Sequence, residues 1–161
     1  MGGMTTRIGF YHLVRSPLEK ALPELLEKAL ANGHRIIVMA GSAERVAFID
    51  SLLWTCEPDS WLPHGTGRDG DADLQPIFIT DREENPNGAD LLMVTDGVVP
   101  VGVGDFARCL VLFDGNDDIA VQNARELWKD WKQRDFELTY YQQGDRGWQE
   151  KARVGGGSVA S

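Results

Sequence analysis

Short apolar runs alternate with longer amphipathic stretches in the first third of the chain. Residues 7–13 (RIGFYHL) and 35–40 (RIIVMA) are predicted strands, because continuous apolar runs of this length are typical of strands in a buried parallel sheet. Amphipathic helices are predicted at 17–32 and from Ala43 to about Trp54. The order strand, helix, strand, helix with short connections favours an α/β fold.

The first predicted helix carries start and stop signals in its sequence. Ser16 is expected to be the N-cap, with Pro17 at the first helical position and Glu19 completing a capping box. Gly33 is expected to follow the helix in the left-handed conformation that ends many helices. Pro23 is expected to bend the helix, because its ring lacks an N–H and crowds the carbonyl four residues back.

The rest of the chain is predicted to complete a single three-layer domain. Residues 55–74 are rich in Pro, Gly and Asp and are expected to form a long loop, and loops of this length are usually functional or disordered. Further elements are expected as strands at 75–80, 91–95, 108–113 and 136–142 and as a helix at 117–133. The fold class is therefore α/β, with a mainly parallel central sheet flanked by helices.

Length and composition agree with one soluble domain. The chain has 161 residues, of which 42% are apolar and 25% are charged. It has no apolar run of about 18 residues and no signal-peptide pattern at its N-terminus, so neither a membrane span nor secretion is expected. Cys56 and Cys109 lack a ligand-like spacing. Their arrangement predicts neither a disulfide framework nor a zinc site and fits a reducing cytoplasm.

The charge is unevenly distributed. Sixteen Lys and Arg against 25 Asp and Glu give a net charge of −9, which argues against tight direct binding of nucleic acid. Residues 122–153 carry seven basic and six acidic side chains, so this segment is +1 and the remainder is −10. A site for an anionic partner is therefore expected near the C-terminal end.

Two motif-like patterns fail in their contexts. Residues 65–70 match G-x-G-x-x-G, but WLPH precedes them and an acidic run follows, whereas a dinucleotide loop must join a strand to a helix N-terminus. Asp69, Asp71 and Asp73 begin like a calcium loop, yet Leu74 occupies the position that requires Gly. A solvated acidic loop is the preferred interpretation, and no metal site is predicted.

Signatures of catalysis are absent from the sequence. It contains neither a P-loop nor a nucleophile elbow. His12, His34 and His64 are dispersed, and each is expected to be structural. No catalytic residues and no cofactor are predicted. Gly41-Ser42, before the second helix, is the one candidate phosphate-binding loop, and on it rests the alternative function of a nucleotide-binding α/β enzyme or sensor.

The helix predicted at 117–133 has two contrasting sides. At about 100° per residue, the expected core side carries Ile119, Ala120, Asn123, Ala124, Leu127 and Trp131. The other side carries Val121, Arg125, Trp128, Lys129 and Lys132. This stripe is either a solvated face whose cations favour the helix dipole, or a seat for an acidic peptide formed by cations and an indole.

The segment after the second helix carries a second candidate surface. Trp54 ends the helix and Trp61 follows in the predicted loop. Two Trp residues so close in sequence belong either to the core or to a partner surface, where Trp is enriched.

Taken together, these features resemble the chi subunit of bacterial DNA polymerase III, a part of the clamp-loader complex. The resemblance covers residues 4–152 and rests on Phe10–Leu13, Leu53-Trp54, Trp61–Gly65, Ala124–Lys129, Phe136–Tyr140 and Gly147-Trp148. It implies a fold resembling nucleotide-binding domains over residues 4–152. The composition of residues 153–161, rich in Gly and Ser, separately predicts a disordered tail. The resemblance also implies a noncatalytic cytoplasmic subunit that links the clamp loader to single-stranded-DNA-binding protein by holding that protein's acidic C-terminal tail.

The resemblance assigns roles to the stripe on the 117–133 helix. It implies that Arg125, Trp128 and Lys129 lie in the tail pocket. Arg125 is expected to meet a carboxylate of the tail, and Trp128 is expected to pack on its terminal Phe. Tyr140 is expected to line the pocket, and Val121 and Lys132 belong to the same surface. An interaction domain for a different acidic-tailed partner stays open as a further hypothesis.

A second partner is also implied by the resemblance. The family binds a small psi subunit, and the resemblance places that interface at Trp54, Trp61, Leu62, Pro63 and His64. This chain departs from the family pattern in the acidic stretch 68–73 and in residues 145–153. The surface is therefore expected to contact psi, an equivalent clamp-loader component or another protein, or to pack internally.

Overall fold

The computed structural model describes residues 6–14, 17–55, 63–67, 70–134, 136–145 and 147–155. Its strands are β1 (Arg7–Leu13), β2 (Ile36–Met39), β3 (His64–Thr66), β4 (Ile77–Thr80), β5 (Leu91–Val94), β6 (Arg108–Asp114), β7 (Glu137–Gly144) and β8 (Gly147–Val154). Its helices are α1 (Leu18–Ala31), α2 (Ala43–Thr55) and α3 (Asp118–Lys132), with 3₁₀ turns at Ala72–Leu74 and Val103–Asp105.

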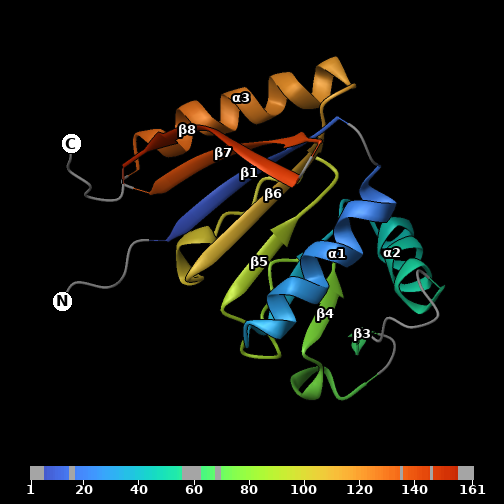
Figure 1. The fold of residues 1–161 in the computed structure, drawn as a ribbon. Coiled ribbons are helices and arrows are strands. Elements are labelled where there is room, and N and C mark those ends of the chain that lie inside the picture. The colour runs from blue at the N-terminus through green and yellow to red at the C-terminus, as the bar shows by residue number, and fades with distance from the viewer. Residues whose placement is uncertain are drawn as a thin grey trace.

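The eight strands form one sheet in the order β3-β4-β2-β5-β6-β1-β7-β8. Every neighbouring pair is parallel except β7 with β8, which form an antiparallel hairpin. Helices α1 and α2 lie on one face of the sheet and α3 lies on the other (Figure 1). The predicted three-layer α/β architecture with a mainly parallel sheet is confirmed.

Two apolar cores lie on the two faces of the sheet, because side chains alternate along each strand. On β1, Ile8 and Phe10 join the core under α3, whereas Tyr11 joins the core under α1 and α2. Trp131 of α3 and Leu22 of α1 are fully buried in these cores. Burial of side chains of this size stabilises the fold by about 1.5–3 kcal/mol each.

The chain leaves two neighbouring strands in opposite directions. Strand β1 leads into α1 on one face, and its parallel neighbour β6 leads into α3 on the other. Such a point, where connections diverge from the carboxyl ends of adjacent strands, opens a crevice at the edge of an α/β sheet. Ligands of open α/β sheets commonly bind at such a crevice.

The region between α2 and β4 differs from the prediction of a continuous loop. Residues 64–66 form β3, an edge strand paired with β4, and a 3₁₀ turn follows at Ala72–Leu74. The sequence His-Gly-Thr has no apolar side chain, so β3 is formed by backbone pairing that an apolar pattern does not reveal. Strand β8 was also not predicted, because six of its eight residues are exposed and alternation is weak.

The ends of α1 partly follow the prediction. Gly33 has the expected positive φ of 86°, and Pro23 lies inside the helix with its ring buried. The predicted capping box is wrong in register, because Pro17 occupies the N-cap position and makes no side-chain cap hydrogen bond. Ser16 lies outside the described residues, as do 156–161 of the predicted tail. Within the part of the chain that is described, no helix has the length and apolarity to cross a membrane.

Candidate peptide-binding site

Helix α3 is fixed to the sheet by its cap and by one apolar side. The Asp117 carboxylate accepts hydrogen bonds from the backbone N–H of Ile119 at 3.0 Å and of Ala120 at 3.3 Å, which makes Asp117 the N-cap. Further along, Leu127 and Trp131 are buried against the sheet. The predicted amphipathic helix is therefore present, with its outer side turned away from the core.

The first turns of α3 correct one part of the helical projection. Ile119 and Asn123 were expected on the core side, but Ile119 is 73% exposed and Asn123 is also exposed. Both residues line a cavity at the carboxyl edge of the sheet, whereas Ala120 in the same turn packs against the core. Periodicity identifies the apolar side of a helix but not which of its positions the rest of the fold covers.

The predicted peptide-binding residues Trp128 and Tyr140 lie together on the β7 side of α3. The Trp128 ring packs edge-on against Phe10, with centroids 5.3 Å apart, and against Tyr140, with centroids 6.0 Å apart. Both rings are half-buried. Trp128 is thus less exposed than the sequence indicated. Its indole is packed on two other rings and presents part of its apolar surface to solvent.

His12 was expected to be structural, and the sequence did not place it beside the peptide-binding residues. Its Nδ1 contacts the Tyr140 hydroxyl, and its ring lies 5.1 Å from that of Phe113. Burial lowers the pKa of His12; a hydrogen bond to the Gly115 backbone opposes this effect, and Arg125 reinforces it. Burial also raises the pKa of Tyr140, and Arg125 partly offsets that rise. Side chains alternate between the two faces along a strand, so His12 lies on the same face as Phe10, which is the α3 face. This alternation could have indicated its position from sequence.

Three cations border these aromatic side chains. Arg125, Lys129 and Lys132 are exposed on α3, and none of them forms an ion pair with any residue that the structure describes. Arg125 lies close enough to His12 and Tyr140 to shift both pKa values. Val121 is half-buried one turn before Arg125. The structure therefore brings all six predicted residues onto α3 and the adjacent β7.

The arrangement defines what this surface accommodates chemically. Cations without internal partners attract carboxylates, and an Arg guanidinium binds a carboxylate through two parallel hydrogen bonds. The half-buried rings of Trp128 and Tyr140 offer an apolar seat beside those cations. We refer below to Val121, Arg125, Trp128, Lys129, Lys132, Tyr140 and His12 as the α3/β7 surface.

The second predicted surface lies at the β3 edge of the sheet. Trp54 is 63% exposed at the end of α2, and its ring lies 4.5 Å from the ring of His64. His64 is buried, and its Nε2 lies 3.1 Å from Asp50 Oδ1. Trp54 therefore packs on a side chain that is itself held in place. Pro63 is half-buried, and Trp61 and Leu62 lie outside the described residues.

The candidate phosphate-binding loop at Gly41-Ser42 already forms hydrogen bonds with Asp96. The backbone N–H of Gly41 donates to Asp96 Oδ2 at 3.0 Å, and Arg45 Nε donates to Asp96 Oδ1 at 3.1 Å. A phosphate at this loop would have to displace the Asp96 carboxylate from the Gly41 N–H. Within the described residues, no group of three or more His, Cys, Asp or Glu is placed to hold a metal ion.

Fold and site together define a doubly wound α/β protein with a cationic, aromatic-backed surface on its single-helix face. Residues 4–139 match the model of the family described as DNA polymerase III chi subunit, HolC. The chain belongs to this DNA polymerase III chi subunit family, as its sequence motifs indicated. The match includes α3 and ends one residue before Tyr140.

A probable DNA polymerase III subunit chi from Rickettsia prowazekii (strain Madrid E) is a more specific relative. It is 28% identical to this chain over 88 residues, which are 55% of this chain and 53% of the relative. The aligned part thus spans about half the length of that curated relative.

Proposed function

We propose that this chain is a noncatalytic accessory subunit of DNA polymerase III in DNA replication. It tethers the clamp loader to single-stranded-DNA-binding protein by holding that protein's acidic C-terminal tail on the α3/β7 surface. One observation carries the proposal: Arg125, Lys129 and Lys132 are exposed, without ion-pair partners among the described residues, beside the half-buried rings of Trp128 and Tyr140. Family membership supports a role within the polymerase assembly.

The proposed mechanism combines attraction with a small apolar contact. Arg125 receives the terminal carboxylate or an Asp of the tail, while the final Phe packs on Trp128 and Tyr140. A charged hydrogen bond contributes about 1.5–3 kcal/mol, and burial of a Phe side chain contributes a similar amount. Each contact is therefore modest, and several tails on one strand of DNA multiply the affinity through avidity. The net charge of −9 keeps the rest of the protein from binding DNA directly.

The test is a titration of the protein with an acidic peptide that ends in Asp-Ile-Pro-Phe, followed by Trp fluorescence. Arg125→Ala is expected to weaken binding about tenfold, because one charged hydrogen bond is lost. A peptide without the final Phe is expected to lose a similar factor. Trp128→Phe identifies the contribution of this indole to the signal.

The matched control is Lys20→Ala, which removes an exposed cation on α1, on the opposite face of the sheet. This variant is expected to bind within about twofold of the parent, because a distant exposed charge contributes little. Equal losses in Lys20→Ala and Arg125→Ala would show a diffuse charge effect and contradict the proposed site. Thermal stabilisation by nucleotides, without any binding of the peptide, would instead favour the nucleotide-binding alternative.

We further propose that the exposed Trp54 forms the contact with a psi subunit or an equivalent clamp-loader component. Its 63% exposure and its support by buried His64 give it the form of an aromatic anchor. Trp54→Ala is expected to abolish assembly with such a component in co-purification while leaving the Asp-Ile-Pro-Phe peptide bound. The proposal also places the protein in the cytoplasm, where the polymerase works.

A further inference from the structure

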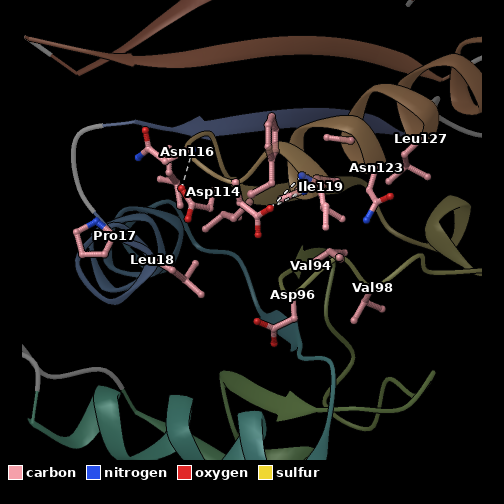
Figure 2. Close-up of a pocket in the computed structure, with 18 of the residues that line it drawn as sticks. Pro17, Leu18, Val94, Asp96, Val98, Asp114, Asn116, Ile119, Asn123 and Leu127 are labelled. Atoms are coloured by element: carbon pink, nitrogen blue, oxygen red, sulfur yellow. Dashed lines mark hydrogen bonds between the residues drawn. The ribbon is translucent and has the colours of Figure 1, made fainter.

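A large cavity opens at the carboxyl edge of the sheet, on the side of α3 opposite to the α3/β7 surface. Its volume is about 860 Å³. It lies where β1 and β6 send the chain to opposite faces, and β5 also ends there. The first turns of α1 and α3 form two of its walls, as Figure 2 shows around Leu18 and Ile119.

The mouth of this cavity carries apolar side chains that the fold itself does not cover. Ile119 of α3 is 73% exposed and Val99, after β5, is 62% exposed. Leu18 and Val98, each half-buried, also line the cavity. Branched side chains left open to water around a concave site are typical of a docking surface.

The charges around the cavity are anionic. Among the described residues that line it, the acidic side chains are Glu19, Asp96, Asp114 and Asp117, and the basic one is Arg45. Arg45 is engaged already, because its Nε lies 3.1 Å from Asp96 Oδ1 and its guanidinium lies over the Phe48 ring. Among the lining residues that the structure describes, a phosphate or an acidic peptide would therefore meet mainly negative charge.

Two flanks of one helix thus present opposite chemistry. Trp128 and Arg125 lie on the β7 side near Tyr140, whereas Ile119 and Asn123 line the cavity on the other side. We propose that the cavity binds a basic amphipathic segment of a partner protein, with Leu or Ile side chains entering between Ile119 and Val99. Its Lys or Arg side chains pair with Glu19 and Asp114 at the rim. This partner is separate from the acidic tail, and both can be bound at once.

The experiment mixes the full chain with a fluorescein-labelled helical peptide in which pairs of Leu alternate with pairs of Lys. Binding is measured by fluorescence anisotropy. Saturable binding is expected, and Ile119→Ser is expected to weaken it at least fivefold. Glu19→Gln and Asp114→Asn are each expected to weaken it about threefold at low salt. A peptide with Glu in place of Lys is expected not to bind.

Matched controls come from exposed residues away from the cavity. Leu74→Ser removes an exposed apolar side chain, and Glu24→Gln removes an exposed carboxylate of α1. Both are expected to bind the basic peptide like the parent protein. Arg125→Ala is expected to bind the basic peptide like the parent and the acidic one about tenfold more weakly, which separates this site from the α3/β7 surface.

Three outcomes overturn the proposal. One is the absence of saturable binding, and another is equal weakening by the cavity and control variants, which would show nonspecific attraction to an acidic protein. The third is a dimer of the chain, detected by sedimentation, that Ile119→Ser dissociates, because a second copy would then be the occupant of the cavity. If the parent protein and all variants fail to bind the acidic peptide but still bind the basic one, only the proposed function is contradicted.

Discussion

At the scale of single residues, the His12–Tyr140 contact links the core to the α3/β7 surface. The imidazole lies between the Phe113 ring and the Tyr140 hydroxyl, and burial lowers its pKa. Because His12 is half-buried, the folded state disfavours its charged form. The nearby charge of Arg125 acts in the same direction.

The lowered pKa of His12 predicts a stability change with pH. The unfolded chain takes up a proton near pH 6.5, the usual histidine value, whereas the folded chain takes it up only at lower pH. Stability is therefore highest above pH 6.5 and falls as the pH drops from there toward the folded pKa. Urea unfolding between pH 5 and pH 7.5 measures this slope.

The variant that checks this assignment is His12→Gln, which cannot be protonated. Its stability is expected to vary less with pH over the same range. An unchanged slope would place the titrating group elsewhere. Asp90, whose pKa is also lowered, titrates below this range and does not confuse the result.

Predictability from sequence also differs from residue to residue. Arg125, Lys129 and Lys132 were identified correctly as an outward stripe of α3, because helical periodicity alone fixes their direction. His12 was missed as a neighbour of Tyr140, because that contact joins strands separated by 128 positions. Local patterns carry no information about which parallel strand lies beside another.

At the scale of elements, α3 is the part of the molecule that carries most of the proposed chemistry. Its bounds, Asp118–Lys132, differ from the predicted range by one residue at each end, because Asp117 signals the start clearly. The exposure of Ile119 and Asn123 was not predictable from periodicity, and neither were β3 and β8. Those two strands have no continuous apolar pattern, since each lies at an edge of the sheet.

The N-cap of α3 gives a test at this scale. Asp117→Ala removes the acceptor for the N–H groups of Ile119 and Ala120 and is expected to cost about 1 kcal/mol. For a domain of this size the melting temperature falls by about 3 °C. Calorimetry of Asp117→Ala beside Asp118→Ala, which removes a carboxylate but no cap, separates the hydrogen bonds from the charge.

At the scale of the whole molecule, an acidic protein is proposed to capture an acidic peptide. The net charge of −9 repels such a peptide at long range, and the cations of α3 attract it at short range. Salt weakens both effects, with a screening length of about 10 Å at 0.1 M. The ion pairs between the peptide and α3 are exposed, so salt screens them strongly. We expect this loss of attraction to set the direction in which the affinity changes with salt.

Affinity for the Asp-Ile-Pro-Phe peptide is therefore expected to fall about threefold to tenfold between about 50 mM and about 500 mM salt. Titrations at several salt concentrations give the slope. In Arg125→Ala the slope is expected to be shallower, because one contact charge is missing. A tail affinity that rises with salt would mean that long-range repulsion outweighs the cations of α3, in contradiction to the proposed mode of binding.

The position of β1 inside the sheet, between β6 and β7, has a consequence for how the protein is made. This first strand pairs on one side with β6, roughly a hundred residues later, and on the other side with β7. While the ribosome is still translating, an apolar strand is exposed without either neighbour until the chain has emerged through β6 and then β7. Folding therefore completes late in synthesis, and a chain interrupted after β5 would be a target for chaperones and proteases rather than a working half.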